Sequence, residues 1–340
     1  MKLRVFGVLG APIARAAAEA IEYERLGFDG VATQETAHDP FLPLALAAEQ
    51  TRSLELMTGI AVAFARSPMT LAHVAHDLNS LSGGRFILGL GSQVKAHIER
   101  RFSMPWSHPA ARMREMVQAI RAIFAAWYDG EKLAFEGEFY RHTLTSPAFT
   151  PKDTQAGKPP IFTAAVGPQM TETAGAVADG LIIHPFTTER YLREVTLPHL
   201  RAGLESAGRP STAFRTCLAP FIVSGRNEGE LSRARKVVAD RVAFYASTPT
   251  YRPVLEQQGW GELQAQLHAL TRQGRWAELG SLITDEVLEQ FAIVGEVPEI
   301  APKVWRRFGD VITDVSLVAE GLDLATLSAI ARDLKAQVPA

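Results

Sequence analysis

Three side chains that carry or exchange protons fall within five positions of one another, at Glu35, His38 and Asp39. An imidazole changes its charge near neutral pH and a carboxylate accepts a proton, so this segment holds the groups that general acid–base catalysis requires. Asp39 stands directly before Pro40 and suits the N-cap of a helix, which accounts for its presence. Capping does not account for the other two, and we take His38 and Glu35 as the candidate catalytic residues.

Two short turns have the composition of anion-binding sites. Gly91-Ser92-Gln93 and Ala165-Val166-Gly167-Pro168 each lie between a predicted strand and a predicted helix, where free backbone N–H groups and the helix dipole attract phosphate. Ordinary tight turns have the same composition, but two of them on neighbouring strands favour a phosphorylated cofactor. A further glycine lies inside the strand-like segment Thr58-Gly59-Ile60, where it indicates a bulge, the close approach of a flat ligand, or simple packing.

All of these residues lie in predicted strands or in the loops that follow them. Short apolar segments alternate with amphipathic ones, and the apolar segments are Leu3–Val8, Phe28–Thr33, Leu54–Ala63, Arg85–Leu90, Pro160–Val166, Leu181–His184, Thr216–Val223 and Val311–Val318. Because the strands are continuously apolar, both of their faces are buried and the sheet is parallel. Eight strand–helix units predict an α/β fold, a TIM (β/α)8 barrel with insertions, whose functional loops follow the strands. The competing doubly wound sheet needs a dinucleotide fingerprint, and Gly89-Leu90-Gly91 lacks its third glycine.

We expect one barrel domain over residues 1–340, interrupted twice. Residues 129–160 predict an irregular or hairpin-like insertion, because glycines and prolines break the pattern. Residues 250–291 predict a helical insertion after the seventh strand, placed to cover the barrel mouth. Its Tyr251 is a candidate for the substrate pocket, together with three residues in or near the loops that follow strands, Phe64, His97 and His184.

Composition narrows the class of protein. The chain of 340 residues has a net charge of −2, so no basic excess drives binding to nucleic acid or to a membrane surface. The single cysteine, Cys217, has no partner for an intrachain disulfide, which favours a reducing, cytoplasmic location. No apolar run approaches the roughly 18 residues of a membrane span. The motifs of serine hydrolases, P-loop NTPases and zinc proteases are absent from the sequence, and we expect no bound metal.

The segment Leu81–Gly91, LSGGRFILGLG, resembles the signature of the bacterial luciferase-like superfamily. Supporting pieces occur in the order typical of that superfamily, including Glu35 and His38, Thr58-Gly59-Ile60, Arg66-Ser67-Pro68 and Ala165-Val166-Gly167-Pro168. The resemblance covers nearly the whole chain and implies a TIM-barrel oxidoreductase that uses FMN or the deazaflavin coenzyme F420. Within the superfamily the chain looks most similar to coenzyme F420-dependent oxidoreductases, on the segments 64–68 and 91–97.

The resemblance also implies roles for individual residues. A non-proline cis peptide at Gly59-Ile60, next to Thr58, would back the cofactor ring. The loops after strands four and five would hold the phosphate-bearing chain of the cofactor, through Gly91, Ser92, Gln93, Ala165, Val166, Gly167 and Pro168. Glu35 or His38 would transfer the proton. Relatives often place an acidic residue directly before this histidine, whereas Glu35 and His38 stand three positions apart in this chain.

The function that the resemblance implies is hydride transfer between coenzyme F420 and a small organic substrate. One alternative is an FMN-dependent monooxygenase that uses O2 and is supplied by a flavin reductase, and another is a non-catalytic flavin-binding protein. Relatives imply a homodimer, through helices that flank the second and third strands. The sequence does not specify the substrate.

Overall fold

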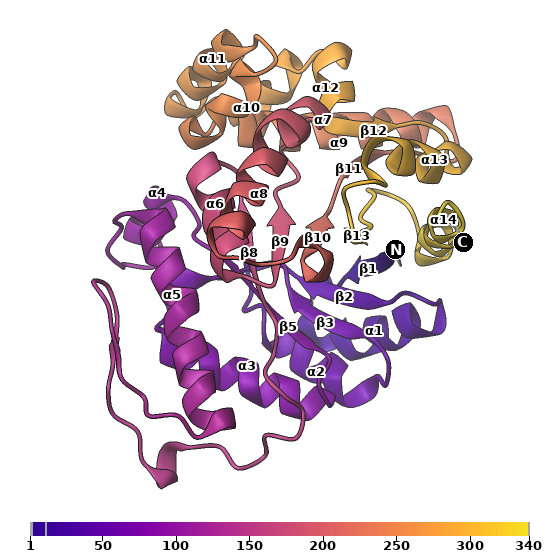
Figure 1. The fold of residues 1–340 in the computed structure, drawn as a ribbon. Helices are drawn as coiled ribbons and strands as arrows, with labels where there is room; N and C mark the ends of the chain where they lie inside the picture. Colours follow the sequence, from indigo (N-terminus) through magenta and orange to yellow (C-terminus); the bar gives the residue numbers. More distant parts are fainter. Residues whose placement is uncertain (1–2, 11, 339–340) are drawn as a thin grey trace.

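Eight parallel strands close on themselves to form a barrel (Figure 1). Their order around the barrel is β3-β2-β1-β13-β10-β9-β8-β5, and the pairing of β3 with β5 closes the ring. The strands are β1 Arg4–Val8, β2 Gly30–Thr33, β3 Glu55–Thr58, β5 Phe86–Gly91, β8 Ile161–Ala165, β9 Gly180–Ile183, β10 Arg215–Leu218 and β13 Asp314–Ser316. The predicted TIM barrel is confirmed. This computed structural model describes residues 3–10 and 12–338, so residues 1, 2, 11, 339 and 340 of the predicted domain lie outside it.

Helices surround the barrel, and most of them follow a strand directly. They are α1 Ala16–Arg25, α2 Leu42–Gln50, α3 Pro68–Ser82, α4 Lys95–Arg100, α5 Pro109–Phe124, α6 Pro168–Val177, α7 Glu189–Tyr191, α8 Leu197–Ser206, α9 Glu228–Ala246, α13 Val297–Phe308 and α14 Leu324–Ala336. Local signals set their ends. In α3, the Ser67 hydroxyl accepts the backbone N–H of Thr70, and Gly83 ends the helix at φ 67°.

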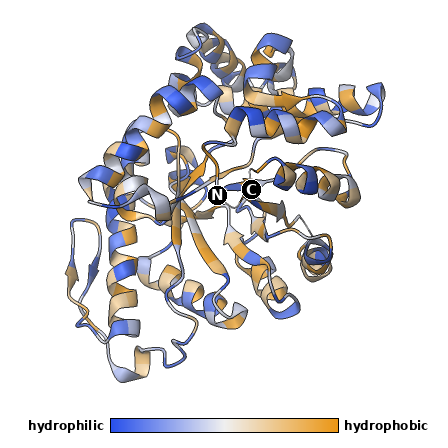
Figure 2. Ribbon diagram, turned by 45° about the vertical axis from the view of Figure 1, so that its right-hand side comes forward, coloured by the Kyte–Doolittle hydropathy of each residue, from blue (hydrophilic) through white to orange (hydrophobic). Residues whose placement is uncertain are grey.

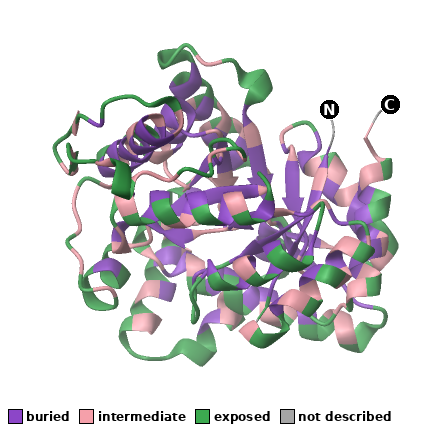
Figure 3. Ribbon diagram, turned by 90° about the horizontal axis from the view of Figure 1, so that it is seen from below, coloured by how far each residue is buried: buried purple, intermediate pink, exposed green. Residues whose placement is uncertain are grey.

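Side chains of alternate strand residues fill the barrel. The inward-facing set forms one small apolar cluster made of Phe6, Ala32, Met57, Ile87, Phe162, Ile182 and Cys217. The outward-facing residues join a larger core beneath the helices. The strands are accordingly the most apolar part of the ribbon, and the exposed residues lie on the outer faces of the helices and in the loops (Figures 2 and 3).

An ion cluster closes the amino-terminal end of the barrel. The Arg215 guanidinium donates through Nε to Asp314, at 3.0 Å, and through Nη2 to Glu55, at 2.6 Å. All three residues begin strands, and the side chain of Asp314 is only 1% exposed. These contacts hold the pKa of Arg215 above its usual range. The opposite end, where the strands finish, is therefore the end that can admit a ligand.

The two predicted insertions contain regular structure. Residues 129–160 include a hairpin of β6 Phe135–Glu136 and β7 Arg141–His142, whose turn donates three backbone N–H groups to the carboxylate of Glu115 on α5. Residues 250–291 form α10 Arg252–Glu256, α11 Gly261–Arg272 and α12 Asp285–Phe291, which lie together at the top of Figure 1. Their apolar residues share a second core with α9.

Two predicted strands are each divided in the structure. The segment Leu54–Ala63 splits into β3 and the short β4 Ala61–Val62, with a bulge between them. The segment Thr216–Val223 splits at Ala219-Pro220 into β10, which stays in the barrel, and β11 Phe221–Val223, which leaves it. Proline has no N–H for a sheet ladder, which is consistent with a break at this point. β11 pairs with β12 Ala292–Val294, a strand that the sequence did not predict.

Candidate active site at the barrel mouth

Two adjoining hollows lie at the carboxyl ends of the barrel strands. The larger has a volume of about 280 Å³ and is lined from β1, β9, β10, β13, β11 and α9. The smaller, of about 180 Å³, lies beside β1, β2 and the loop that leads to α2. Val8 and Gln34 line both. Most residues of the larger hollow are apolar, and its charged residues, Arg241 and Glu320, pair with each other at 3.2 Å. A small, largely uncharged molecule suits such a lining.

An aromatic wall borders the larger hollow. The His184 ring lies 4.8 Å from the ring of Tyr245 and 4.9 Å from that of Tyr251, so the structure brings two predicted pocket residues together. Tyr245 lines the hollow itself, and no pattern in the sequence singled it out. The insertion contributes Tyr251 and is held against this wall by Phe291, whose ring stacks on Phe186 at 4.4 Å.

The protonation states of this wall follow from its burial. The backbone N–H of Phe186 donates to Nδ1 of His184 at 3.0 Å, so the neutral ring carries its proton on Nε2, 3.4 Å from the Tyr251 hydroxyl. Desolvation lowers the pKa of His184 to about 4 and raises that of Tyr251 to about 12. Burial also raises the pKa of Tyr245. Near neutral pH all three side chains are uncharged hydrogen-bond donors.

Glu35 is tied into the scaffold of the mouth. Its Oε2 accepts from the backbone N–H of Val62 and from Arg66, both at 2.7 Å, and its side chain is 6% exposed. Arg66 also pairs with Asp39 at 3.2 Å. Asp39 in turn accepts the backbone N–H groups of Phe41 and Leu42 at the start of α2, as expected for a cap. These contacts hold the end of β4 against the loop that follows β2.

His38 is differently placed. It is exposed and lines the smaller hollow beside Gln34. The structure therefore separates the two candidate catalytic residues, because Glu35 is buried in an ion pair while His38 is open to the mouth. Of the two, His38 lines one of these hollows and Glu35 lines neither.

The bulge between β3 and β4 contains the expected cis peptide, between Gly59 and Ile60. The Thr58 hydroxyl donates to the carbonyl of Gly89 at 2.8 Å and accepts that residue's N–H at 2.9 Å, which bridges the strands where they separate. A Cβ on Gly91 would lie 2.7 Å from Cγ1 of Ile60, so this glycine makes room for the bulge. A Cβ on Gly59 would meet its neighbours only at 3.6 Å or more.

The start of α6 is open. Gly167 is its N-cap, and among the described residues no side chain accepts the first backbone N–H groups. A Cβ on Gly167 would meet no atom within 4 Å, and the Val166 carbonyl accepts from the Tyr191 hydroxyl at 3.2 Å. Ala165 is buried on the outer face of β8, and its neighbour Ala164 is partly exposed on the inner face.

The remaining predicted residues lie at the edges of the site or below it. Ser92 and Gln93 bond mainly within their own loop, where the Gln93 side chain accepts the N–H of Val94 at 3.0 Å. His97 is exposed on α4. Phe64 is fully buried, with its ring 5.7 Å from that of Trp106, and lies in the core rather than beside either hollow.

The mouth thus has two halves. The residues predicted to hold the cofactor come from β3, β4, β5 and β8, which are contiguous around the barrel. The hollows and the aromatic wall lie at β2, β1, β13, β10 and β9, which form the rest of the ring. One half offers small residues and free backbone N–H groups, and the other offers an apolar recess. The arrangement suits two molecules that meet between the halves.

Comparison with other proteins places this geometry in a family. The chain is 49% identical to an uncharacterised protein of Mycobacterium tuberculosis over 334 residues, 98% of both chains. It is 31% identical to a 5,10-methylenetetrahydromethanopterin reductase of Methanolobus tindarius over 290 residues, 84% of this chain and 83% of the relative. Within the described residues, no helix is long and apolar enough to cross a membrane.

Solved structures have the same fold. A coenzyme F420-dependent tetrahydromethanopterin reductase from Methanopyrus kandleri matches with a TM-score of 0.77 at 21% identity, over 98% of this chain and 97% of that one. An FMN-containing type II Baeyer–Villiger monooxygenase component of Pseudomonas putida matches with a TM-score of 0.68 at 14% identity, over 100% and 99% of the two chains. A family model described as luciferase-like monooxygenase matches residues 2–311. The chain therefore belongs to the luciferase-like monooxygenase family.

Proposed function

We propose that this protein is an oxidoreductase that transfers hydride between coenzyme F420 and a small, largely apolar organic substrate. The observation that carries the proposal is the division of the barrel mouth into two halves of different chemistry. The relatives named as tetrahydromethanopterin reductases, one of them F420-dependent by its name, support the deazaflavin over FMN.

The residues of the first half fit a flat, phosphorylated cofactor. Gly59 and Ala164 place no large side chain at the inner face of the mouth, which leaves room for a ring. The uncapped start of α6 supplies backbone N–H donors, and the empty space beside Gly167 admits a phosphate. Bound there, a reduced deazaflavin would supply the hydride.

The residues of the second half would bind and orient the substrate. With a substrate bound, the mostly apolar recess would leave little room for water, which would protect a hydride transfer from competing reactions. The Tyr245 hydroxyl, kept protonated by burial, is placed to donate to a substrate oxygen. His38 at the rim of the smaller hollow is the group we assign to proton exchange, through its imidazole nitrogens. Glu35 is a positioning residue, because it binds Val62 and Arg66 and so holds the end of β4 against the loop that carries His38.

A substitution at the start of α6 tests the cofactor assignment. Gly167→Asp puts a carboxylate where the phosphate would lie, and the backbone there, at φ −84° and ψ 162°, is one that aspartate adopts readily as an N-cap. We expect the fold to persist and the Kd for coenzyme F420, followed by fluorescence, to rise at least about tenfold. Gly167→Ala is the matched control and should bind as the natural protein does. If Gly167→Asp also binds normally, the phosphate does not lie at α6.

FMN chemistry remains the second candidate, because an FMN-containing monooxygenase component has the same fold. That function would require O2 and a flavin reductase as partner. The other alternative is a protein that binds a flavin without turnover, and His38→Asn distinguishes it from an enzyme. In an enzyme this substitution should abolish reduction of the substrate while the affinity for the cofactor stays unchanged.

A further inference from the structure

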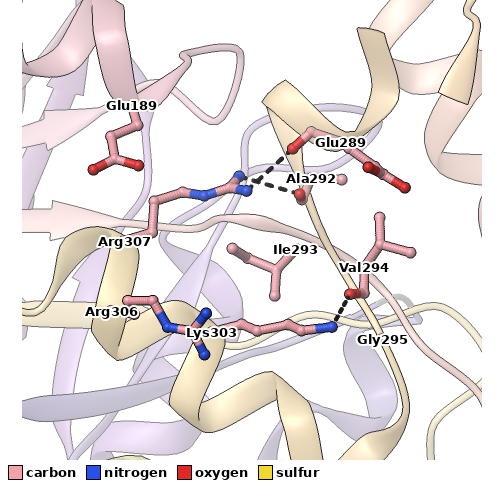
Figure 4. Close-up of a pocket in the computed structure, with 9 residues that line it drawn as sticks. All are labelled: Glu189, Glu289, Ala292, Ile293, Val294, Gly295, Lys303, Arg306 and Arg307. Carbon is pink, nitrogen blue, oxygen red and sulfur yellow. Dashed lines mark hydrogen bonds between the residues drawn. The ribbon is translucent and has the colours of Figure 1, made fainter. Parts of the chain in front are cut away.

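A hollow of about 720 Å³, larger than the two at the mouth, lies outside the barrel (Figure 4). Its walls are the strand β12, the end of α12, the start of α7 and one face of α13. None of its lining residues contributes to either hollow at the mouth. The proposed oxidoreductase site therefore does not account for it.

Three cationic side chains of α13 line this hollow, Lys303, Arg306 and Arg307. Their spacing of three and four residues places them on the same side of the helix (Figure 4). Arg307 donates to the carbonyls of Ala292, at 3.2 Å, and Glu289, at 3.1 Å. Lys303 donates to the Val294 carbonyl at 2.9 Å and pairs with Glu299 at 3.2 Å.

These contacts give two of the cations a structural task. β12 pairs with β11 on one edge only, and the Ala292 and Val294 carbonyls would otherwise be open on the other edge. Lys303 and Arg307 cap them, which protects the edge from pairing with another chain. Arg306 has no such task, since it forms no hydrogen bond or ion pair with any residue in the part of the chain that the structure describes.

The positive charge of the hollow is only partly neutralised. A guanidinium has five N–H donors, and Arg307 uses two of them on carbonyls. The Glu189 carboxylate is engaged by Arg193 at 2.9 Å. The carboxylate of Glu289 points away from the Arg307 guanidinium (Figure 4). Glu189 and Glu289 both line the hollow and both act on the charge of Arg307, so the three cations face two carboxylates, one of them shared with Arg193. Among the described residues, most N–H groups of Arg306 and Arg307 have no hydrogen-bond acceptor.

We propose that this hollow is a second ligand site, for an organic anion with a doubly charged oxyanion group, either a phosphate or paired carboxylates. Arg306 and Arg307 contact the anion, and Lys303 lies at its edge. The volume is that of pockets for drug-sized ligands, and Ile293 supplies apolar surface. A peptide strand is a poorer occupant, because the outward carbonyls of β12 are already capped.

Calorimetric titration of the full chain with inorganic pyrophosphate and, separately, citrate tests this site. We expect one of these probes to bind, and Arg306→Gln to weaken it about tenfold, as for the loss of one charge-assisted hydrogen bond. The stronger probe identifies the anion as phosphate-like or carboxylate-like. Arg307→Gln should weaken binding too, but it also removes the donor that caps the carbonyls of β12. If that variant fails to fold, Arg307→Lys keeps a donor for these carbonyls and should still weaken binding.

Two control variants test whether the probe binds in this hollow and nowhere else on the protein. Arg332→Gln makes the same charge change at an exposed position of α14 and should leave the probe's Kd unchanged. Gly167→Asp disrupts the proposed phosphate site at α6 and should also leave the probe's Kd unchanged. A failure of the proposed cofactor site can therefore be told apart from a failure of this second site. Absence of binding at millimolar probe, an equal loss in Arg332→Gln, or unchanged binding in Arg306→Gln would each overturn the proposal.

Discussion

Replacement of Glu35 by alanine tests whether this residue positions the barrel mouth through its buried ion pair. The substitution removes the acceptor of the Val62 N–H, on a fully buried residue, and the carboxylate partner of Arg66, whose side chain is 21% exposed. Breaking a buried ion pair by removing one partner costs about 3–5 kcal/mol. The entropy of unfolding, about 2.1 cal/mol/K per residue, makes this loss a fall in Tm of about 4–7 °C for 340 residues.

The assay is thermal unfolding, monitored by circular dichroism. Asp39→Asn is the control, because this second partner of Arg66 is 39% exposed and its ion pair is worth at most about 1 kcal/mol. His38→Asn should also melt close to the natural protein, since surface substitutions change stability by about 0.5 kcal/mol or less. If Glu35→Ala melts at the same temperature as these two variants, the ion pair does not hold the end of β4 against the loop that follows β2. Our assignment of Glu35 as a positioning residue is then wrong.

Three further predictions concern the pH dependence of stability, the ion cluster at the amino-terminal end of the barrel, and dimer formation. His184 titrates near 6.5 in the unfolded chain and at about 4 in the folded one, so stability falls as pH drops between these values, and His184→Gln should show a shallower fall in Tm. Arg215→Met removes the closer cationic partner of the buried Asp314 carboxylate, leaving Arg4 at 3.9 Å, and should cost up to about 3–5 kcal/mol in urea unfolding, while the cofactor Kd, set at the other end of the barrel, stays unchanged. Leu42 on α2 is 58% exposed beside the 39% exposed Leu46, and we propose that they lie in a homodimer interface; Leu42→Glu should give a monomer by light scattering, whereas Trp276→Glu should not.

The fold was predictable because its signals are local. Each barrel strand lies within a short, mainly apolar segment that is followed by turn residues and a helical pattern, so periodicity alone placed all eight. The division of the segment Thr216–Val223 was missed, although Pro220 marks it. β12 was missed because its partner, β11, lies some seventy positions earlier, and only the fold brings the two together.

The candidate site was less predictable because it depends on contacts between distant segments. The pairing of Glu35 with Arg66 joins residues 31 positions apart, and no spacing rule reveals it. Tyr245 reaches the mouth only through the placement of α9. Phe64 follows a strand, as a pocket residue should, yet packs beneath Trp106. The alternation of side chains along β8 was a usable signal, since it places Ala164 at the mouth and turns Ala165 toward the helices.

The identity of the cofactor is the central claim, and a parallel fluorescence titration of the purified protein with coenzyme F420 and with FMN tests it most directly. We predict tight, saturable binding of coenzyme F420 and much weaker binding of FMN. Tight binding of FMN with weak binding of F420 would contradict the deazaflavin assignment and favour an oxygen-dependent monooxygenase. Failure to bind either would remove the cofactor from the barrel mouth altogether.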